Sequence, residues 1–173
     1  MSLVEIKIET QSFRAIPSDP VDLADAVKLA GARSNGAFAV IEHDEPRALI
    51  VIDMEGSLLI HGISSPEAAR LIAEETILRI GLSNKGLVME AGEVLASFSI
   101  GRAVLIELAA ERFMDAEHDL RLDALRIAAK GHKCTLLLFN NGRGIVLGQS
   151  SRKVAEMAAS HWVGKLSEEG ALA

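Results

Sequence analysis

Two stretches of this 173-residue chain decide the fold: GSLLIHGISSPEAARLIAE, from Gly56 to Glu74, and GRGIVLGQSSRKVAEMAAS, from Gly142 to Ser160. Each contains a glycine, a second glycine six residues later, one variable residue, a Ser-Ser pair and an alanine-rich helical pattern. The second glycines, Gly62 and Gly148, lie 86 residues apart. A match at this separation predicts that one half of the chain duplicates the other.

Two further alignments extend the repeat. EIKIETQSFRA from Glu5 aligns with EVLASFSIGRA from Glu93 at an offset of 88, and AFAVIEHDEPRALIVI from Ala37 aligns with ALRIAAKGHKCTLLLF from Ala124 at an offset of 87. Offsets that fall by one residue at a time indicate length changes at turns. We therefore predict a first repeat over residues 1–81, a connection over 82–91 and a second repeat over 92–173.

Composition narrows the class of protein. Apolar residues make up 49% of the chain, but no apolar run is long enough to predict a membrane span. The single cysteine, Cys134, and the absence of a leader pattern predict a soluble, cytoplasmic protein. A net charge of −6 argues against a strongly basic surface for nucleic acid, and six aromatic residues leave little material for base stacking.

Both halves show the same order of elements. In the first half, an alternating segment over 4–13 predicts a strand, and residues 21–32 predict a helix that follows Ser18-Asp19-Pro20. Residues 37–44, 48–54 and 56–62 predict an antiparallel meander, and Ser65-Pro66 begins a second helix. The prediction is an α+β fold with two halves, each strand, helix, three strands, helix. One antiparallel sheet then carries four helices on one face.

This order resembles the TATA-box-binding protein (TBP) family of archaeal and eukaryotic transcription factors. The resemblance rests on the duplication and on EPRALIVIDMEGSLLIHG (Glu45–Gly62) and TLLLFNNGRGIVLG (Thr135–Gly148), each followed by a Ser-capped helix. It covers nearly the whole chain and implies a saddle, in which one curved sheet carries helices on its convex face and binds double-stranded DNA on its concave face. The family's Thr-Gly at the end of each meander is His61-Gly62 and Leu147-Gly148 here.

The resemblance also assigns positions on the concave face. Family members insert two pairs of phenylalanines between base steps, and those four positions match Asn35, Ile52, Leu122 and Phe139, so that only Phe139 is retained. A symmetric asparagine pair that reads A·T base pairs matches Glu5 and Glu93, whose carboxylates cannot donate hydrogen bonds.

The rest of the predicted concave face follows from alternation along the strands. Ser57 stands where the family has a lysine, whereas Arg143 keeps a positive charge. The remaining positions are largely apolar: Lys7, Ile50, Leu59, His61, Leu95, Leu137, Ile145 and Leu147. This assignment of residues to the concave face requires that the alternating residues be buried: Ile6, Ile8, Val94 and Ala96. If the strand register slipped by one residue, Glu5 and Glu93 would point toward the helices instead.

Two functions are compatible with such a face. One is a divergent TBP-like factor that binds DNA with weakened or altered TATA recognition. The other is a saddle that no longer binds DNA and whose apolar concave face binds a protein partner, a second copy of the chain or an apolar ligand. The missing phenylalanines and the glutamates favour the second function, and the resemblance favours the first.

Enzymatic interpretations are weaker. The acidic run DAEHD over 115–119 has no matching ligand set elsewhere in the chain. His132 and Cys134 share a strand face but form no CxxC pattern, and Gly142-x-Gly144 joins two strands rather than a strand and a helix. We therefore expect no catalytic residue, no metal site and no cofactor.

Overall fold

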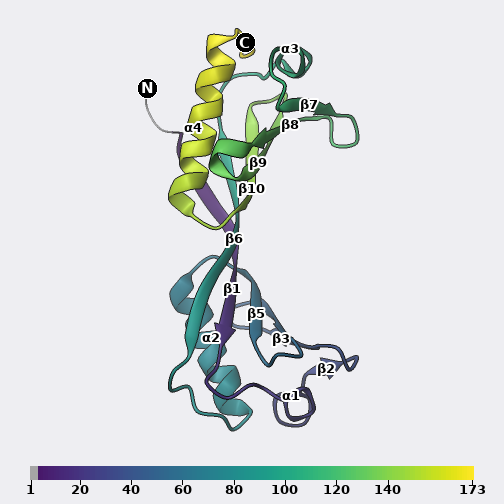
Figure 1. Ribbon diagram of the computed structural model, residues 1–173, viewed down its shortest axis with the longest axis vertical. Coiled ribbons are helices and arrows are strands. Elements are labelled where there is room, and N and C mark those ends of the chain that lie inside the picture. Colours follow the sequence, from purple (N-terminus) through teal and green to yellow (C-terminus); the bar gives the residue numbers. More distant parts are fainter. Residues whose placement is uncertain (1–3) are drawn as a thin grey trace. The chain divides into compact units, whose positions relative to one another are not determined.

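The computed structural model describes residues 4–173, which form four α-helices, one 3-10 helix and ten strands (Figure 1). The first half contains β1 (Ile6–Ile16), α1 (Leu23–Ala30), β2 (Arg33–Ser34), β3 (Ala39–His43), β4 (Ala48–Ile52), β5 (Leu58–Ile63) and α2 (Pro66–Arg79). The second half contains β6 (Val88–Ser99), α3 (Ile106–Arg112), β7 (Ala116–Asp119), β8 (Ala124–Ala129), η1 (Lys130–His132), β9 (Cys134–Phe139), β10 (Arg143–Gln149) and α4 (Arg152–Glu168).

The chain divides into two compact units, which we describe separately. The N-terminal unit comprises residues 10–92, and the C-terminal unit comprises the residues up to Glu9 together with 93–173. Strands β1 and β6 contribute to both units, and β6 begins at Val88, inside the connection predicted for residues 82–91. The hydrogen-bonded strand order is β2-β3-β4-β5-β1-β6-β10-β9-β8-β7, so that the ten strands belong to one sheet.

Each half contains one strand more than predicted. The short strands β2 and β7 precede the predicted meander and pair antiparallel with β3 and β8. β2 has only two residues, and all of its side chains are exposed, so it carries no alternating apolar pattern that could be read from the sequence.

The serine caps predicted for α2 and α4 are confirmed, but α1 begins at Leu23 with Asp22 as its cap rather than directly after Ser18-Asp19-Pro20. The side chain of Asp22 accepts a hydrogen bond from the N–H of Ala24 at the start of α1. Ser65 and Ser151 cap α2 and α4 in the same way, each through a serine hydroxyl that accepts from the backbone N–H three residues later at 3.2 Å. The duplicated Ser-Ser motif therefore has one structural role in both halves.

In each unit the helices cover one face of the strands. The core of the N-terminal unit joins α1 and α2 to β1, β3, β4 and β5, with Ile50, Ile52, Leu58, Ile60, Ile72 and Ile77 almost completely buried. The core of the C-terminal unit joins α3 and α4 to β6 and β8–β10, with Leu125, Ile127, Leu136, Leu138, Val146 and Leu166 almost completely buried. In both units we call the strand face opposite this core the open face.

Strand pairing gives the true correspondence between the halves. Ile41 pairs with Ile50, and Ile127 pairs with Leu136, so that residues of β3 and β4 correspond to residues of β8 and β9 at an offset of 86. The same offset relates Ser65 to Ser151 at the helix N-termini. The predicted offset of 87 in this region is wrong.

The correspondence of β1 with β6 also differs from the prediction. Gln11 of β1 pairs with Ile63, Val94 of β6 pairs with Gln149, and each strand pair shows a register shift directly after this position. Gln11 therefore corresponds to Val94, an offset of 83 rather than the predicted 88. The offset rises from 83 at β1 and β6 to 86 at β3 and β8, mainly because one turn between these strands differs in length. The backbone N–H of Asn35 bonds to Phe38, whereas the corresponding turn of the second half runs from Asp119 to Ala124 and is two residues longer.

Candidate functional site

The open face of the C-terminal unit contains most of the predicted site. Glu5, Lys7, Glu93 and Arg143 are exposed, as is Leu95. Phe139, Ile145 and Leu147 are half-buried on the same face. Leu137 also belongs to this face, because it alternates with the core residues Leu136 and Leu138, but neighbouring side chains leave it only 7% exposed.

The predicted orientation of β1 and β6 is confirmed. Val94 and Ala96 are buried in the core of the C-terminal unit, and Ile6 and Ile8 pack against it. The register slip that would have turned Glu5 and Glu93 toward the helices is therefore absent. Their carboxylates lie on the exposed side of these strands.

Two placements in the N-terminal unit are wrong. Ile50 and Ile52 were expected on the open face, but both are 0% exposed and lie in the core beneath the helices. β4 reads ALIVI, with apolar residues on both faces, so alternation alone does not reveal which set is buried. The open face instead carries Leu49 and Val51, which pair with the predicted residues His61 and Leu59.

The positions assigned to inserted phenylalanines also change. The turns Asp53–Gly56 and Phe139–Gly142 are equivalent, each closed by a glycine N–H that donates to the first carbonyl at 3.0 Å. Asp53, not Ile52, therefore corresponds to Phe139. Leu122 lies in the longer turn between β7 and β8 and is 47% exposed.

The two glutamates are not symmetry equivalents. Because the offset between β1 and β6 is 83, the residue of the first half that corresponds to Glu93 is Thr10. A threonine hydroxyl can donate a hydrogen bond, whereas a carboxylate only accepts. The predicted pair of like charges is thus replaced by one hydroxyl and one carboxylate at matching strand positions.

A hollow of about 580 Å³ lies on the open face of the C-terminal unit. Glu5, Lys7, Phe139, Asn141 and Arg143 are among the residues that line it. Ser97 and Glu9 also line it: the hydroxyl of Ser97 donates to Glu9 at 2.6 Å, and the ammonium group of Lys7 lies 3.7 Å from the same carboxylate. The hollow thus combines an aromatic ring, an amide, a guanidinium and two carboxylates.

Most basic side chains of the open faces are already paired with carboxylates, and sequence reasoning did not find these pairs. In the N-terminal unit, Arg14 lies 2.9 Å from Glu55 and 3.3 Å from Asp53. In the C-terminal unit, Arg126 lies 2.7 Å from Asp119, and this contact holds the pKa of the Asp119 carboxyl below its usual value. Arg14 alternates with the core residues Phe13 and Ala15, which is the signal that could have placed it on the open face.

Arg143 differs from these side chains. It is exposed at the start of β10, and among residues 4–173 no carboxylate forms an ion pair with it. Its main-chain N–H donates to Oδ1 of Asn141 at 3.0 Å, and its backbone pairs with Ser99 of β6. The guanidinium is therefore available to an anionic ligand.

The residues considered for metal binding or catalysis are separately engaged. Asp115 pairs with Lys130 at 3.3 Å, and His118 lies 2.9 Å from Asp123. Burial raises the pKa of the half-buried Cys134 thiol, which disfavours the reactive thiolate. Within residues 4–173, no three His, Cys, Asp or Glu side chains are grouped so that they could hold a metal ion.

Comparison with solved structures decides the fold. Methanococcus jannaschii TBP superimposes with a TM-score of 0.86 at 19% sequence identity, over 95% of this chain and 99% of that chain. The chain has the TBP fold. The match confirms the predicted α+β class, with one antiparallel sheet and helices on one face of the strands in each unit. At this identity the TBP fold is what the comparison establishes, and function must be argued from the side chains.

The remaining comparisons give no further argument about the fold or the function of this chain. A heterotetrameric sarcosine oxidase from Corynebacterium gives a TM-score of only 0.35 at 13% identity, which carries no argument. No family model matches the sequence, and no curated protein matches it. None of the helices in the described part of the chain is both long and apolar enough to cross a membrane.

Proposed function

We propose that this protein is a divergent TBP-like factor that binds duplex DNA weakly, through the open face of its C-terminal unit. The observation that carries the proposal is Arg143, an exposed guanidinium without an ion-pair partner in the described residues, beside Phe139 on a face that no helix of its own unit covers. Arginine binds phosphate, and an apolar ring can enter a minor groove.

The same face accounts for weak binding. Lys7 lies beside Glu9, and Arg126 is held by Asp119, so that these cations are largely neutralised before any phosphate approaches. Glu5 and Glu93 present exposed negative charge on the same side. Like charges repel the DNA backbone, and each neutralised cation removes one phosphate contact from the interface.

The shortage of large apolar side chains on this face also favours weak DNA binding. Minor-groove proteins that bend DNA insert apolar residues between base steps. Phe139 is half-buried at the end of β9, and its counterpart in the first half is the charged Asp53. We therefore expect little bending of the duplex and a weak preference for A·T-rich sequence.

Fluorescence anisotropy with an A·T-rich and a G·C-rich duplex tests this proposal. With one or two phosphate contacts, the logarithm of the binding constant should fall with the logarithm of salt concentration at a slope of about −1 to −2. Arg143→Gln should remove about one unit of that slope. The matched control is Arg112→Gln, at the exposed C-terminal turn of α3. The proposal is rejected if the wild-type chain gives no salt-dependent anisotropy change at low ionic strength.

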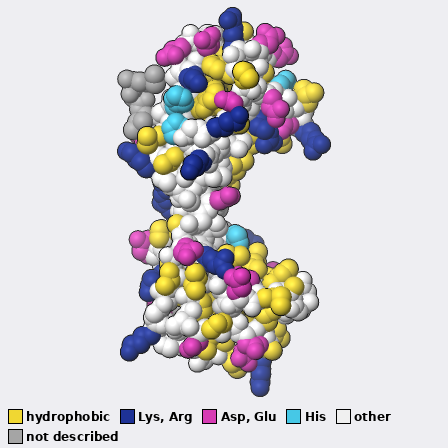
Figure 2. All heavy atoms as spheres, viewed as in Figure 1, with side chains coloured by type: hydrophobic (Ala, Val, Ile, Leu, Met, Phe, Trp, Pro, Cys, Tyr) yellow, Lys and Arg dark blue, Asp and Glu magenta, His cyan; other side chains and the backbone are white. Residues whose placement is uncertain are grey.

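A second candidate is self-association through the open face, which exposed apolar side chains favour. Leu49 is 39% exposed and Leu95 is 37% exposed, although both are strand residues beside other apolar side chains. Figure 2 shows hydrophobic side chains gathered at the surface of the unit that carries α2. Arg143 could pair with Glu5 or Glu93 of a second copy, as a twofold interface requires.

Light scattering over a range of protein concentrations separates the two candidates. A dimer that dissociates in the Leu95→Glu variant, together with no anisotropy response to DNA, would support self-association. A monomer at all concentrations that binds DNA in a salt-dependent way would support the first candidate. The Met114→Glu variant is the control, because Met114 is fully exposed and lies between α3 and β7, outside the strands.

A further inference from the structure

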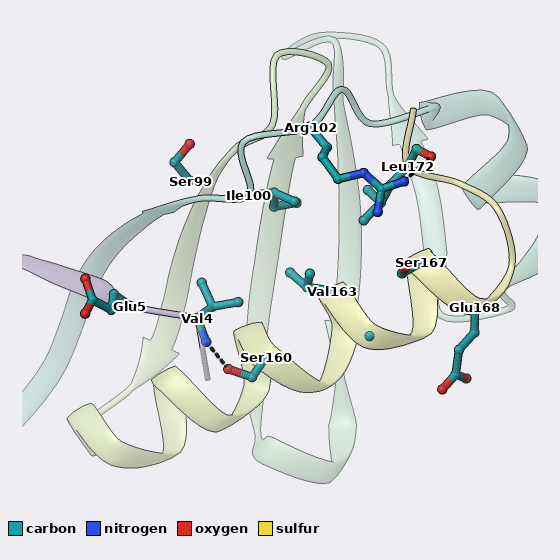
Figure 3. Close-up of a pocket in the computed structure, with 11 residues that line it drawn as sticks. Val4, Glu5, Ser99, Ile100, Arg102, Ser160, Val163, Ser167, Glu168 and Leu172 are labelled. Atoms are coloured by element: carbon teal, nitrogen blue, oxygen red, sulfur yellow. Dashed lines mark hydrogen bonds between the residues drawn. The ribbon is translucent and has the colours of Figure 1, made fainter. Parts of the chain in front are cut away.

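A second cavity lies entirely within the C-terminal unit and takes no part in the proposed DNA contact. It has a volume of about 710 Å³ and is lined by Val4, which is the first described residue, and by the segment after β6, helix α4 and Leu172 (Figure 3). Cavities of this size commonly hold small molecules. Nothing in the fold or in the proposed function explains it.

Four aliphatic side chains contribute to the walls of this cavity, which polar side chains also line. Val4 and Ile100 form one side, Val163 projects from α4, and Leu172 closes the far end. In Figure 3 the side chains of Ile100 and Val163 face each other across the cavity. The hydroxyl of Ser160 accepts a hydrogen bond from the Val4 N–H at 2.6 Å, which ties the first described residues to α4. An aliphatic chain fits between such walls.

One charged group is held over this apolar space. Arg102 donates from Nη2 to the main-chain oxygen of Leu172 at 2.9 Å and from Nε to that of Ala173 at 3.2 Å. These two bonds fix the guanidinium, and within residues 4–173 its remaining N–H groups have no hydrogen-bond partner. In Figure 3 the guanidinium lies above the cavity, and Ser167 lies on the facing helix.

The acidic residues of the rim do not oppose this positive charge within the cavity. Glu5 and Glu168 contribute to the lining, but in Figure 3 both carboxylates point away from the enclosed space. A fixed guanidinium and a hydroxyl that line one cavity are donors that can both bind a carboxylate. The interior therefore presents an apolar wall with a cationic, hydrogen-bonding end.

We propose that this cavity binds a small aliphatic carboxylate, with its hydrocarbon chain between Ile100 and Val163 and its carboxylate on Arg102 and Ser167. The residues that would hold this ligand take no part in the proposed DNA contact, although Glu5 and Ser99 line both this cavity and the hollow on the open face. The ligand class follows from the combination of an apolar space with one oriented guanidinium. Neither feature alone would specify it.

Isothermal titration calorimetry with octanoate tests the proposal on the full chain. Octanoate should bind with saturable heat, and octanol and octylamine of the same chain length should bind at least tenfold more weakly. Arg102→Gln should weaken octanoate binding by more than about tenfold, since a hydrogen bond to a charged group is lost. Arg102→Lys should retain part of the affinity, and Arg143→Gln, on the open face, should retain all of it.

A second variant guards against loss of folding in Arg102→Gln. Val163→Phe fills the space beside Ile100 and should abolish octanoate binding while the circular dichroism spectrum stays unchanged. Equal binding of octanol and octanoate, tighter binding of octylamine, or unchanged affinity in both Arg102→Gln and Val163→Phe would each overturn the proposal. Octylamine binding would instead assign the rim glutamates as the recognition groups.

Discussion

Gly62 and Gly148 occupy the same β-bulge in the two halves of the chain, with φ of 89° and 84°. In each half the strand that carries this glycine changes register against its partner next to the glycine. In the pair of β1 with β5 the shift lies between Gln11 and Phe13 of β1, and in the pair of β6 with β10 it lies between Val146 and Gln149 of β10. Positive φ is strained for residues with a Cβ, which explains why glycine recurs at both positions.

Replacing either bulge glycine should therefore destabilise the protein through backbone strain. At both sites an added Cβ would find its nearest atom 3.9 Å away, so that no steric clash contributes. We expect Gly62→Ala and Gly148→Ala each to lower the free energy of unfolding by about 1–2 kcal/mol. Urea denaturation measures the change. Gly131→Ala is the control, because Gly131 does not have positive φ and has open space around it, and it should change stability little.

Gly144 should be intolerant of substitution for a different reason. Its φ is not positive, but an added Cβ would collide with the ring of Phe98, which packs directly over the glycine. Gly144→Ala should cost about 1–3 kcal/mol of stability through overpacking. The double variant Gly144→Ala, Phe98→Leu should recover part of that loss. If the two changes are additive in urea denaturation, the contact with Phe98 is not the cause.

His43 should make stability depend on pH. Its Nδ1 lies 2.7 Å from the Pro46 carbonyl and its Nε2 lies 3.2 Å from the Glu75 carboxylate, and both partners are acceptors. The Pro46 hydrogen bond, followed by the bond and charge of Glu75, raises the pKa of His43 above its usual value despite partial burial. A raised pKa in the folded state stabilises the protein at acidic pH, and this contribution is lost as pH rises through that pKa.

Unfolding measured from pH 5 to pH 9 checks this sign. The stability advantage of the wild-type chain over His43→Gln should be largest at the acid end and should shrink toward the alkaline end. Glu75→Gln should weaken the pH dependence without removing it, because the Pro46 carbonyl still favours the protonated ring. An advantage that grows with pH would contradict the assignment of His43 as the protonated partner.

Releasing Arg14 should strengthen DNA binding if the N-terminal unit also contacts the duplex. Asp53 and Glu55 hold its guanidinium, and the buried Nε of Arg14 has no hydrogen-bond partner in the part of the chain that the structure describes. The double variant Asp53→Asn, Glu55→Gln frees one cation, which should steepen the salt dependence by about one unit of slope. The double variant Glu168→Gln, Glu169→Gln, at the exposed C-terminal end of α4, is the charge-matched control. An unchanged slope would confine the DNA contact to the C-terminal unit.

The sequence by itself determined the duplication, the starts of α2 and α4, and the buried side of residues 5–9 and 93–96. These features depend on local signals. Ser65 and Ser151 cap their helices within three residues. Ile6 and Ile8 alternate with charged residues, so that only one face of residues 5–9 can be buried; farther along β1 the buried side is that of Phe13 and Ala15.

Tertiary structure decided the register between strands, the buried face of β4 and the ion pairs that neutralise basic side chains on the open face. β4 is apolar on both sides, so only packing against α2 reveals that Ile50 and Ile52 are buried. The ion pair of Arg14 with Asp53 joins residues 39 positions apart in sequence. Neither kind of contact leaves a local pattern in the chain, because each arises only when distant strands are brought together by folding.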